Sequence, residues 1–460
     1  MSDTRRITDS SVMGTEAVPS VLIKMAFPLM CSMLVQALYN VVDSVYVSMV
    51  SEDCLTALSL AFPVQNILIG LGTGTGVGII TLISRSLGCG DNKRANHVAG
   101  NAIFLAVCCW LLMLVFGIFW AKPFIWSQTD SEAIRSYGDR YLMTVCIGSI
   151  FAYFEICCEK LLQSTSLTKL SMITQMVGAV TNIILDPFFI FGWCGLPAMD
   201  TLGAAIATVI GQAVGAVVGV VLLLRRNREL RISARDLIPD GGIISATYRI
   251  GFPSILMMVV SSFTTYVMNL ILIGFSSTAV AVYGGYFKIQ SMFFMPVFGL
   301  NSAVVPIIGY NFGARKKARI YETVKVGVMY AAVLMVIGMI VLEAFPGFIF
   351  AKVFSASEAM LLIGVPALRI IAIHFPIASF NIVAGSAFQA LDRSVFSFIT
   401  SLMRQVFALL PVAYLLSLTG NVNNVWWCFP IAEVVSTICT VIFLKLTFGN
   451  MERRLAEPVE

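Results

Sequence analysis

Long apolar runs recur along this chain of 460 residues and constrain its fold more than any other feature. The sequence is 58% hydrophobic and 12% charged, whereas soluble globular proteins carry about 25% charged residues. Because a helix needs about 20 apolar residues to cross a bilayer, the runs predict an all-α polytopic membrane protein with twelve transmembrane helices. The expected spans are Val21–Val47, Cys54–Ile83, His97–Trp120, Ile134–Leu162, Leu167–Trp193, Thr201–Leu224, Tyr248–Phe275, Thr278–Ile308, Tyr321–Phe345, Ala359–Ala390, Ser394–Leu418 and Val425–Leu446.

Basic residues gather in alternate loops between these spans. They are Lys93, Arg94, Lys169, Arg225, Arg226, Arg228, Arg231, Arg235, Arg315, Lys316, Lys317, Arg319 and Arg393. Because cytoplasmic loops hold the excess of Lys and Arg, both termini are expected in the cytoplasm. The first residues are polar and lack the apolar core of a signal peptide. The expected organisation is a cytoplasmic tail 1–20, an N-lobe 21–225, a cytoplasmic linker 226–246, a C-lobe 247–447 and a cytoplasmic tail 448–460.

Composition and motifs disfavour several classes of function. The net charge of +5 comes from short loops, and no basic face is interleaved with aromatic residues, so we expect no nucleic-acid partner. The eleven cysteines form no CxxC pair, and His97 and His374 are far apart, which disfavours a metal cluster but leaves either histidine open as a proton relay. The chain also lacks a phosphate-binding GxxxxGK[ST] loop, so we expect an ion gradient to be its energy source. It has no nucleophile with a base positioned to activate it, so we expect no enzyme.

The two halves of the chain resemble each other. Phe27-Pro28, near the start of the first expected span, corresponds to Phe252-Pro253 near the start of the seventh. The same offset pairs Met33 with Met258, Phe62 with Phe287, Gln65 with Gln290, Gly74 with Gly299 and Gly88 with Gly313, and a later offset pairs Gln163 with Gln389. An even number of spans per half makes the repeats parallel, and transporters place their substrate between such halves.

Three polar residues interrupt the apolar pattern of the N-terminal half. Asp43 lies in the first span, where a carboxylate costs on the order of 2.5 kcal/mol or more to insert. Asn182 and Asp186 are four residues apart in the fifth span and share one helix face. The first interpretation places Asp43 near a helix end or against a neighbouring helix. The second places all three around a wet cavity where they take up a cation, and their absence from the second half favours it, because the counterparts are Met268, Ala408 and Val412.

Two acids in the fourth span extend this pattern. Glu155 and Glu159 are four residues apart and share a helix face. Either they line the cavity and attract cationic substrates, or Glu159 is neutralised by the adjacent Lys160.

The helices that carry the acids supply further oxygen atoms. Gln36 and Tyr39 precede Asp43 by seven and four residues, along one face of the first span. Pro187 leaves the carbonyl of Ile183 without its usual donor. That carbonyl is either a cation ligand beside the carboxylates or the mark of a packing kink.

The segments Thr181–Gly192 and Gly203–Thr208 resemble the multidrug and toxic compound extrusion (MATE) family, and the likeness extends over the whole chain through the paired Phe-Pro starts and the Gln163 and Gln389 turns. The resemblance implies two six-helix bundles around a central cavity and antiport of amphipathic organic cations against protons or sodium by alternating access. It implies that the coupling cation, sodium included, binds at Asp43, Asn182, Asp186 and Thr208, with Tyr141 nearby. It implies that substrates contact Gln36, Tyr39, Glu155 and Glu159.

The resemblance also implies the partners and the location. The expected partners are lipophilic organic cations and drugs and the lipid bilayer, with no cofactor other than the coupling ion. The expected form is a monomer in the plasma membrane of a prokaryote. One branch of the family keeps acids in the seventh and tenth helices, and this chain has none in those spans. Glu159 resembles the acid of a Gram-positive drug-efflux branch.

A flippase for lipid-linked sugars is the alternative function, because such proteins share this architecture. A cavity for a pyrophosphate lipid needs several inward basic residues. Beside the acids, the spans hold few basic residues, Arg369 and Arg404 among them, so the composition favours cationic cargo. A membrane enzyme acting on lipids is a third class and would need a catalytic constellation that the chain lacks.

Overall fold

The computed structural model describes residues 9–195, 197–353 and 357–456, and these are helical without β-strands. The long helices are α2 (Val18–Ser48), α3 (Glu52–Gly88), α4 (Asn92–Phe119), α6 (Glu132–Ser164), α7 (Thr168–Phe191), α8 (Asp200–Arg226), α9 (Gly241–Ile273), α10 (Ser277–Gly313), α11 (Lys317–Ala344), α13 (Glu358–Ala372), α14 (Phe375–Ala390), α15 (Ser394–Leu402) with η5 (Met403–Leu409) and α16 (Leu410–Ser417), and α18 (Cys428–Ala456). Short elements connect them: η1 (Asp9–Ser11), α1 (Val12–Thr15), α5 (Ala121–Trp126), η2 (Trp193–Gly195), η3 (Ala234–Leu237), α12 (Pro346–Phe348), η4 (Ile349–Val353) and α17 (Val422–Val425).

The described helices confirm the predicted spans. Eleven helical stretches are long and apolar enough to cross a membrane, and the pair α13 and α14, bent by 51° at their junction, makes up the twelfth. The expected terminal tails fall partly outside the described residues, at 1–8 and 457–460.

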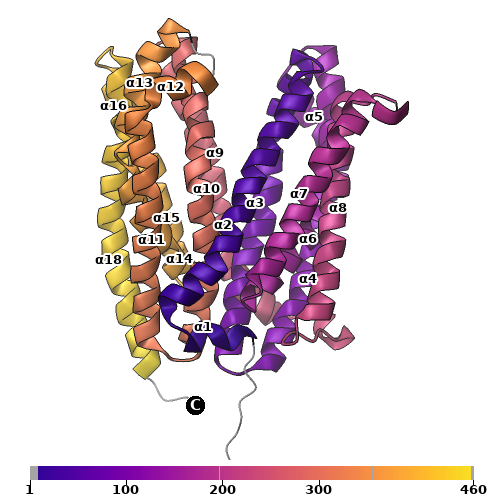
Figure 1. The fold of residues 1–460 in the computed structure, drawn as a ribbon, viewed down its shortest axis with the longest axis vertical. Helices are drawn as coiled ribbons and strands as arrows, with labels where there is room; N and C mark the ends of the chain where they lie inside the picture. The colour runs from indigo at the N-terminus through magenta and orange to yellow at the C-terminus, as the bar shows by residue number, and fades with distance from the viewer. Residues whose placement is uncertain (1–8, 196, 354–356, 457–460) are drawn as a thin grey trace, which may run out of the picture.

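The helices form two bundles of six spans, as the internal repeat predicted (Figure 1). In the N-lobe, α7 packs against α8, and α6 packs against α3, α4 and α8. In the C-lobe, α11 packs against α10 and α14, and α18 packs against η5. Helix α1 and the C-terminal end of α18 lie at the same end of the bundles, here called the terminal end. The ribbons meet at the terminal end and diverge toward the opposite end.

Glycines allow the two lobes to approach closely near the terminal end. Helix α3 packs against α9 and α10, and α2 packs against α10. A Cβ atom at Gly74 would lie 3.1 Å from the carbonyl oxygen of Gly251. A Cβ at Gly88 would come well inside 3.0 Å of the carbonyl oxygen of Tyr310, and one at Gly313 would do the same to that of Arg85. Small residues of this kind let helix backbones come into contact within a membrane.

Charged side chains reinforce the same contact between the lobes. Arg85, at the end of α3, forms an ion pair with Asp392, which follows α14. Arg454 of α18 lies 3.5 Å from the same carboxylate. The guanidinium of Arg85 also lies 4.6 Å from the ring centroid of Phe312 on α10. The terminal end is therefore closed by backbone contact and by charge together.

Residues 9–16, here called the strap, cross the terminal end from one lobe to the other. On the N-lobe side, Ser166 Oγ donates to the carbonyl of Asp9, and the backbone N–H of Ser10 donates to Oε1 of Glu229, just after α8, at 2.6 Å. On the C-lobe side, Asn311 Nδ2 donates to the carbonyl of Met13 at 2.9 Å, and Lys316 Nζ donates to that of Gly14 at 2.7 Å. The strap thus binds both lobes, chiefly through its backbone.

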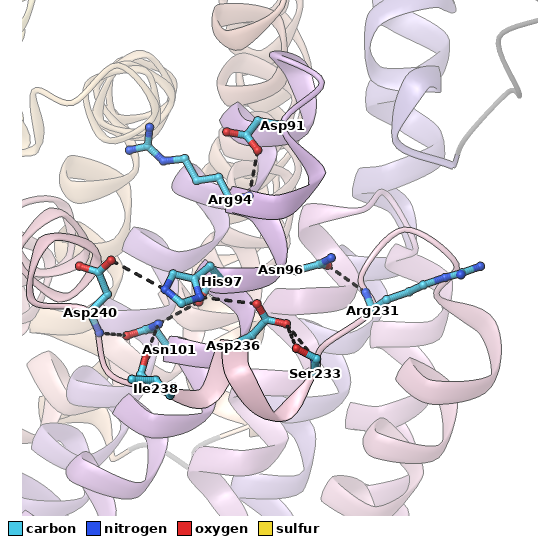
Figure 2. Close-up of polar contacts among 10 residues, drawn as sticks. All are labelled: Asp91, Arg94, Asn96, His97, Asn101, Arg231, Ser233, Asp236, Ile238 and Asp240. Atoms are coloured by element: carbon cyan, nitrogen blue, oxygen red, sulfur yellow. Dashed lines mark hydrogen bonds and ion pairs between the residues drawn. The ribbon is translucent and has the colours of Figure 1, made fainter.

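The linker between the lobes is fastened to α4 (Figure 2). Asn101 accepts a hydrogen bond from the backbone N–H of Asp240 at 2.8 Å and donates to the carbonyl of Ile238 at 3.3 Å. His97 lies 3.5 Å from the carboxylate of Asp236 and 3.8 Å from that of Asp240. Hydrogen bonds from the backbone and side chain of Ser233, together with His97, lower the pKa of Asp236 below its ordinary value.

Candidate functional site

Three helices of the N-lobe bring the sequence-predicted polar residues together. Helix α2 packs against α7, and α7 packs against α8. Asp43 lies on α2, Asn182 and Asp186 lie on α7, and Thr208 lies on α8. Asp186 is 0% exposed and Asn182 is 3% exposed, whereas Asp43 and Thr208 are half-buried.

The amide of Asn182 connects α7 with α8. Its Nδ2 donates to Oδ1 of Asp186 at 3.2 Å and lies 3.4 Å from Oγ1 of Thr208. The four-residue spacing on α7 places the amide and the carboxylate on one face, as predicted. The amide therefore orients one oxygen of Asp186 and leaves the other free.

Three acceptor oxygens in this cluster are buried without a hydrogen-bond partner among the described residues. They are Oδ1 of Asp43, Oδ1 of Asn182 and Oδ2 of Asp186. Buried side-chain oxygens in proteins are normally paired, and each unpaired one costs about 1–3 kcal/mol. Three such oxygens on adjacent helices suit a proton or a hard cation, which prefers oxygen ligands.

Two tyrosines lie close to the same carboxylates. Tyr39 of α2 and Tyr141 of α6 both interact electrostatically with Asp43 and Asp186. The hydroxyl oxygen of Tyr141 accepts a hydrogen bond from Nε2 of Gln65 at 2.5 Å. No role was predicted for Gln65 from the sequence, although its correspondence to Gln290 in the repeat could have indicated one.

Glu155 lies in a niche between α7 and α8. A Cβ at Gly178 on α7 would lie 2.8 Å from its Oε1, and a Cβ at Gly215 on α8 would come even nearer to the same atom. The carboxylate therefore occupies space that only glycine leaves open. Glu155 also interacts electrostatically with Tyr39 and with Glu159, which connects it to the Asp43 cluster.

Glu159 and Lys160 have different hydrogen-bond partners. Glu159 accepts a hydrogen bond from Nε2 of Gln175 at 3.3 Å, whereas Lys160 Nζ donates to Oε1 of Gln163 at 3.0 Å. Both side chains are buried. The charge of Lys160 still acts on Glu159, so the two interpretations of Glu159 stay open.

The remaining predicted residue, Gln36, is half-buried on α2, one turn before Tyr39. Its role in contacting substrates stays a prediction.

Two parallel six-span repeats with a buried acid and amide cluster in one of them define a secondary active membrane transporter. Residues 28–188 and 253–415 match the MatE family, and the chain belongs to this family. It is 24% identical over 442 residues to the multidrug export protein MepA of Staphylococcus aureus strain MRSA252, covering 95% of each chain. It is 25% identical over 430 residues to MepA of Staphylococcus haemolyticus, covering 93% of each chain.

Solved structures share the fold. A multidrug resistance MATE family transporter of the MOP superfamily in an outward-facing conformation superimposes with a TM-score of 0.91 at 22% identity, over 98% of this chain and 100% of that one. A MOP superfamily transporter from Pyrococcus furiosus Vc1, described with a reversed polarity of its binding pocket, gives a TM-score of 0.87 at 22% identity, over 97% and 100%. The two-bundle architecture predicted from the sequence is therefore confirmed.

Proposed function

We propose that this protein is a secondary active multidrug efflux antiporter in the plasma membrane of a prokaryote, exporting amphipathic organic cations in exchange for protons or sodium. The observation that carries the proposal is the buried cluster of Asp43, Asn182 and Asp186 with its three unpaired oxygens. Similarity along nearly the whole chain to proteins named multidrug export protein supports the same function.

Coupling rests on two carboxylates that lie on different helices. Asp43 and Asp186 interact electrostatically, so ionising both at once is unfavourable unless a cation is present. A proton or sodium ion at Asp43, Asn182, Asp186 and Thr208 offsets this repulsion and holds α2 against α7 and α8. Release of the ion weakens that contact. Ion occupancy and helix packing therefore change together.

Acidic residues provide the attraction for a cationic cargo. Glu155 and Asp43 both interact electrostatically with Tyr39, so acidic side chains extend from the coupling cluster along the N-lobe helices. Lys160 is buried and hydrogen-bonded to Gln163, so it offers no free cation there. This arrangement favours an organic cation over the pyrophosphate lipid of a flippase.

Loop charge assigns the terminal end to the cytoplasm. The close approach of α3 to α10 then lies on the cytoplasmic side, and the diverging ends of the bundles face outward. The state described here is thus closed toward the cytoplasm, and the export cycle requires the contacts at Gly88 and Gly313 to separate.

The test uses purified protein in liposomes loaded with a fluorescent lipophilic cation. A sodium gradient and a pH gradient are imposed separately on the wild type, on Asp43→Asn and on Asp130→Asn. Asp130 is a matched control because its fully exposed side chain lies outside the cluster and pairs with Arg135 at 3.0 Å. We expect one gradient to drive cation movement in the wild type and in Asp130→Asn, and neither gradient to do so in Asp43→Asn.

Gradient-driven movement at the normal rate by Asp43→Asn would refute the assigned coupling site. Absence of movement in the wild type under both gradients would refute the antiport itself. In that case, transfer of a lipid-linked sugar across the same vesicles would identify the flippase.

A further inference from the structure

A second charged cluster lies within the C-lobe, apart from the coupling cluster. Arg404 NH1 lies 3.3 Å from Oε2 of Glu433, and Asn381 Nδ2 donates to Oε1 of Glu433 at 2.7 Å. The three residues come from η5, α18 and α14, which pack together. Arg404 and Glu433 both lie well inside stretches that are long and apolar enough to span a membrane.

Burial shows that this is not a surface ion pair. The side chain of Glu433 is 3% exposed, whereas that of Arg404 is 30% exposed. A guanidinium at this depth is stable only beside water or a partner, since exposure to lipid is costly. Glu433 is therefore enclosed, whereas the side chain of Arg404 is partly exposed.

The backbone is irregular on two sides of the cluster. Arg404 lies in η5, a π-helical segment, and π-helical turns occur frequently at functional sites. The helix carrying Asn381 begins at the 51° bend between α13 and α14, beside His374. Non-helical or distorted backbone at membrane depth is tolerated where it is buried in protein or lines a wet cavity.

The amide of Asn381 can serve two protonation states of Glu433. Its Nδ2 donates to Glu433 and, at 3.0 Å, to Oγ1 of Thr437, while its Oδ1 is buried without a partner among the described residues. An amide that turns over presents an acceptor in place of a donor. Asn381 thus stabilises a carboxylate in one orientation and a carboxylic acid in the other.

Few other ionisable groups face this carboxylate. His374 is 3% exposed, its Nδ1 pairs with the carbonyl of Ile371, and it interacts electrostatically with Glu433 and Arg404. Tyr286 of α10 interacts with both as well, and its hydroxyl is buried without a partner among the described residues. Arg404 is thus the cation in direct contact with Glu433, and its displacement would change the charge of the site.

We propose that Glu433 is a second proton-binding site, located in the C-lobe. The proton binds a carboxylate oxygen, the ion pair with Arg404 breaks, and the guanidinium keeps its charge and turns to water. At the offset that aligns Gln163 with Gln389, Asn381 corresponds to Glu155, so a polar side chain occupies this position in both repeats. Only the link from this protonation to the transport cycle rests on the proposed antiport.

The experiment follows carboxylic-acid C=O absorption of the purified protein by infrared spectroscopy during a pH titration. The variants are Glu433→Gln, Asp43→Asn and Glu452→Gln. Glu452 is the matched control because it lies on the same helix, α18, and pairs with Lys317 at 2.8 Å at the terminal end. We expect one titrating band to be absent from Glu433→Gln and present in both other variants.

Substitutions of Arg404 distinguish a proton-binding site from a purely structural ion pair. Arg404→Gln removes the cation that pairs with this carboxylate and should change the Glu433 band, whereas Arg404→Lys keeps a positive charge and should change it less. Identical titrations of the wild type and Glu433→Gln would overturn the proposal and leave the pair a structural brace. Because the band is read without transport, failure of the antiport and failure of this site are distinguishable.

Discussion

Substitution of Gly88 by Ala should shift the protein away from the state that is closed at the terminal end. A Cβ at this position would come well inside 3.0 Å of the carbonyl oxygen of Tyr310, whereas ordinary contacts lie at 3.4–4 Å. The strain falls on α3 and α10 only while the two lobes touch. Overpacking of this kind costs about 1–3 kcal/mol, which corresponds to about a 5- to 150-fold change in the ratio of closed to open molecules.

Spin labels can measure this ratio. Lys93→Cys on the N-lobe and Ala318→Cys on the C-lobe place labels at exposed positions near the terminal end, in a protein whose eleven native cysteines have been replaced. Pulsed dipolar spectroscopy then reports the distribution of distances between the lobes. We expect Gly88→Ala to increase the population with the longer distance.

Gly284→Ala is the matched control, because a Cβ there meets nothing within 4 Å and the residue lies on α10, the helix that Gly88 contacts. Its distance distribution should match that of the labelled parent. If Gly88→Ala and Gly284→Ala gave the same distribution as the parent, the close approach of α3 to α10 would not control which state is populated.

Other contacts give local tests. Hydrogen bonds hold the pKa of Asp236 below its ordinary value of about 3.9. The contribution of this carboxylate to the stability of the linker contact is therefore complete above about pH 3.9 and is lost as the pH falls through the lowered pKa. The protection of amides in residues 231–240, relative to their intrinsic exchange at each pH, should therefore fall in acid in the wild type and lose this pH dependence in Asp236→Asn; a flat wild-type profile would contradict the linker contact. Gly215→Ala should displace Glu155 and weaken binding of the fluorescent cation by about tenfold, for a cost of about 1.4 kcal/mol, and unchanged affinity would remove this acid from the substrate path. Deletion of residues 2–16 should raise the long-distance population measured above, and an unaltered distribution would show that the strap does not hold the lobes together.

Local sequence patterns predicted the spans and part of the candidate site. Apolar runs and the repeat are properties of neighbouring residues, so the two-bundle fold followed from them. The spacing of Asn182 and Asp186 fixes a shared helix face, and the structure joins them by a hydrogen bond and brings Thr208 to the same amide. Their role in coupling stays a prediction until transport is measured.

Contacts between distant spans could not be predicted in this way. Arg404 and Glu433 are 29 residues apart on different spans, and each is surrounded in the sequence mainly by apolar residues. Gln65 and Tyr141 are 76 residues apart. Which face of one helix meets which face of another is decided by packing across the bundle, so no periodicity in the chain encodes these pairs.

The strap was predicted as part of a tail for a different reason. Its contacts with Asn311 and Lys316 use the carbonyl oxygens of Met13 and Gly14. Every residue has such a carbonyl, so the side-chain sequence carries little signal for this binding.

The strap also sets an order of assembly. Met13 and Asn311 are separated by 298 positions, so one of the earliest segments to be synthesised must wait for most of the chain before its carbonyl finds a donor. Synthesis proceeds at about 5–20 residues per second, which makes this interval tens of seconds at the slower rates. During that time the N-lobe can insert and pack without its partner. This contact joins a segment that is synthesised early to one that is synthesised late. The strap can therefore fasten the terminal end only after α10 of the C-lobe has been made and folded.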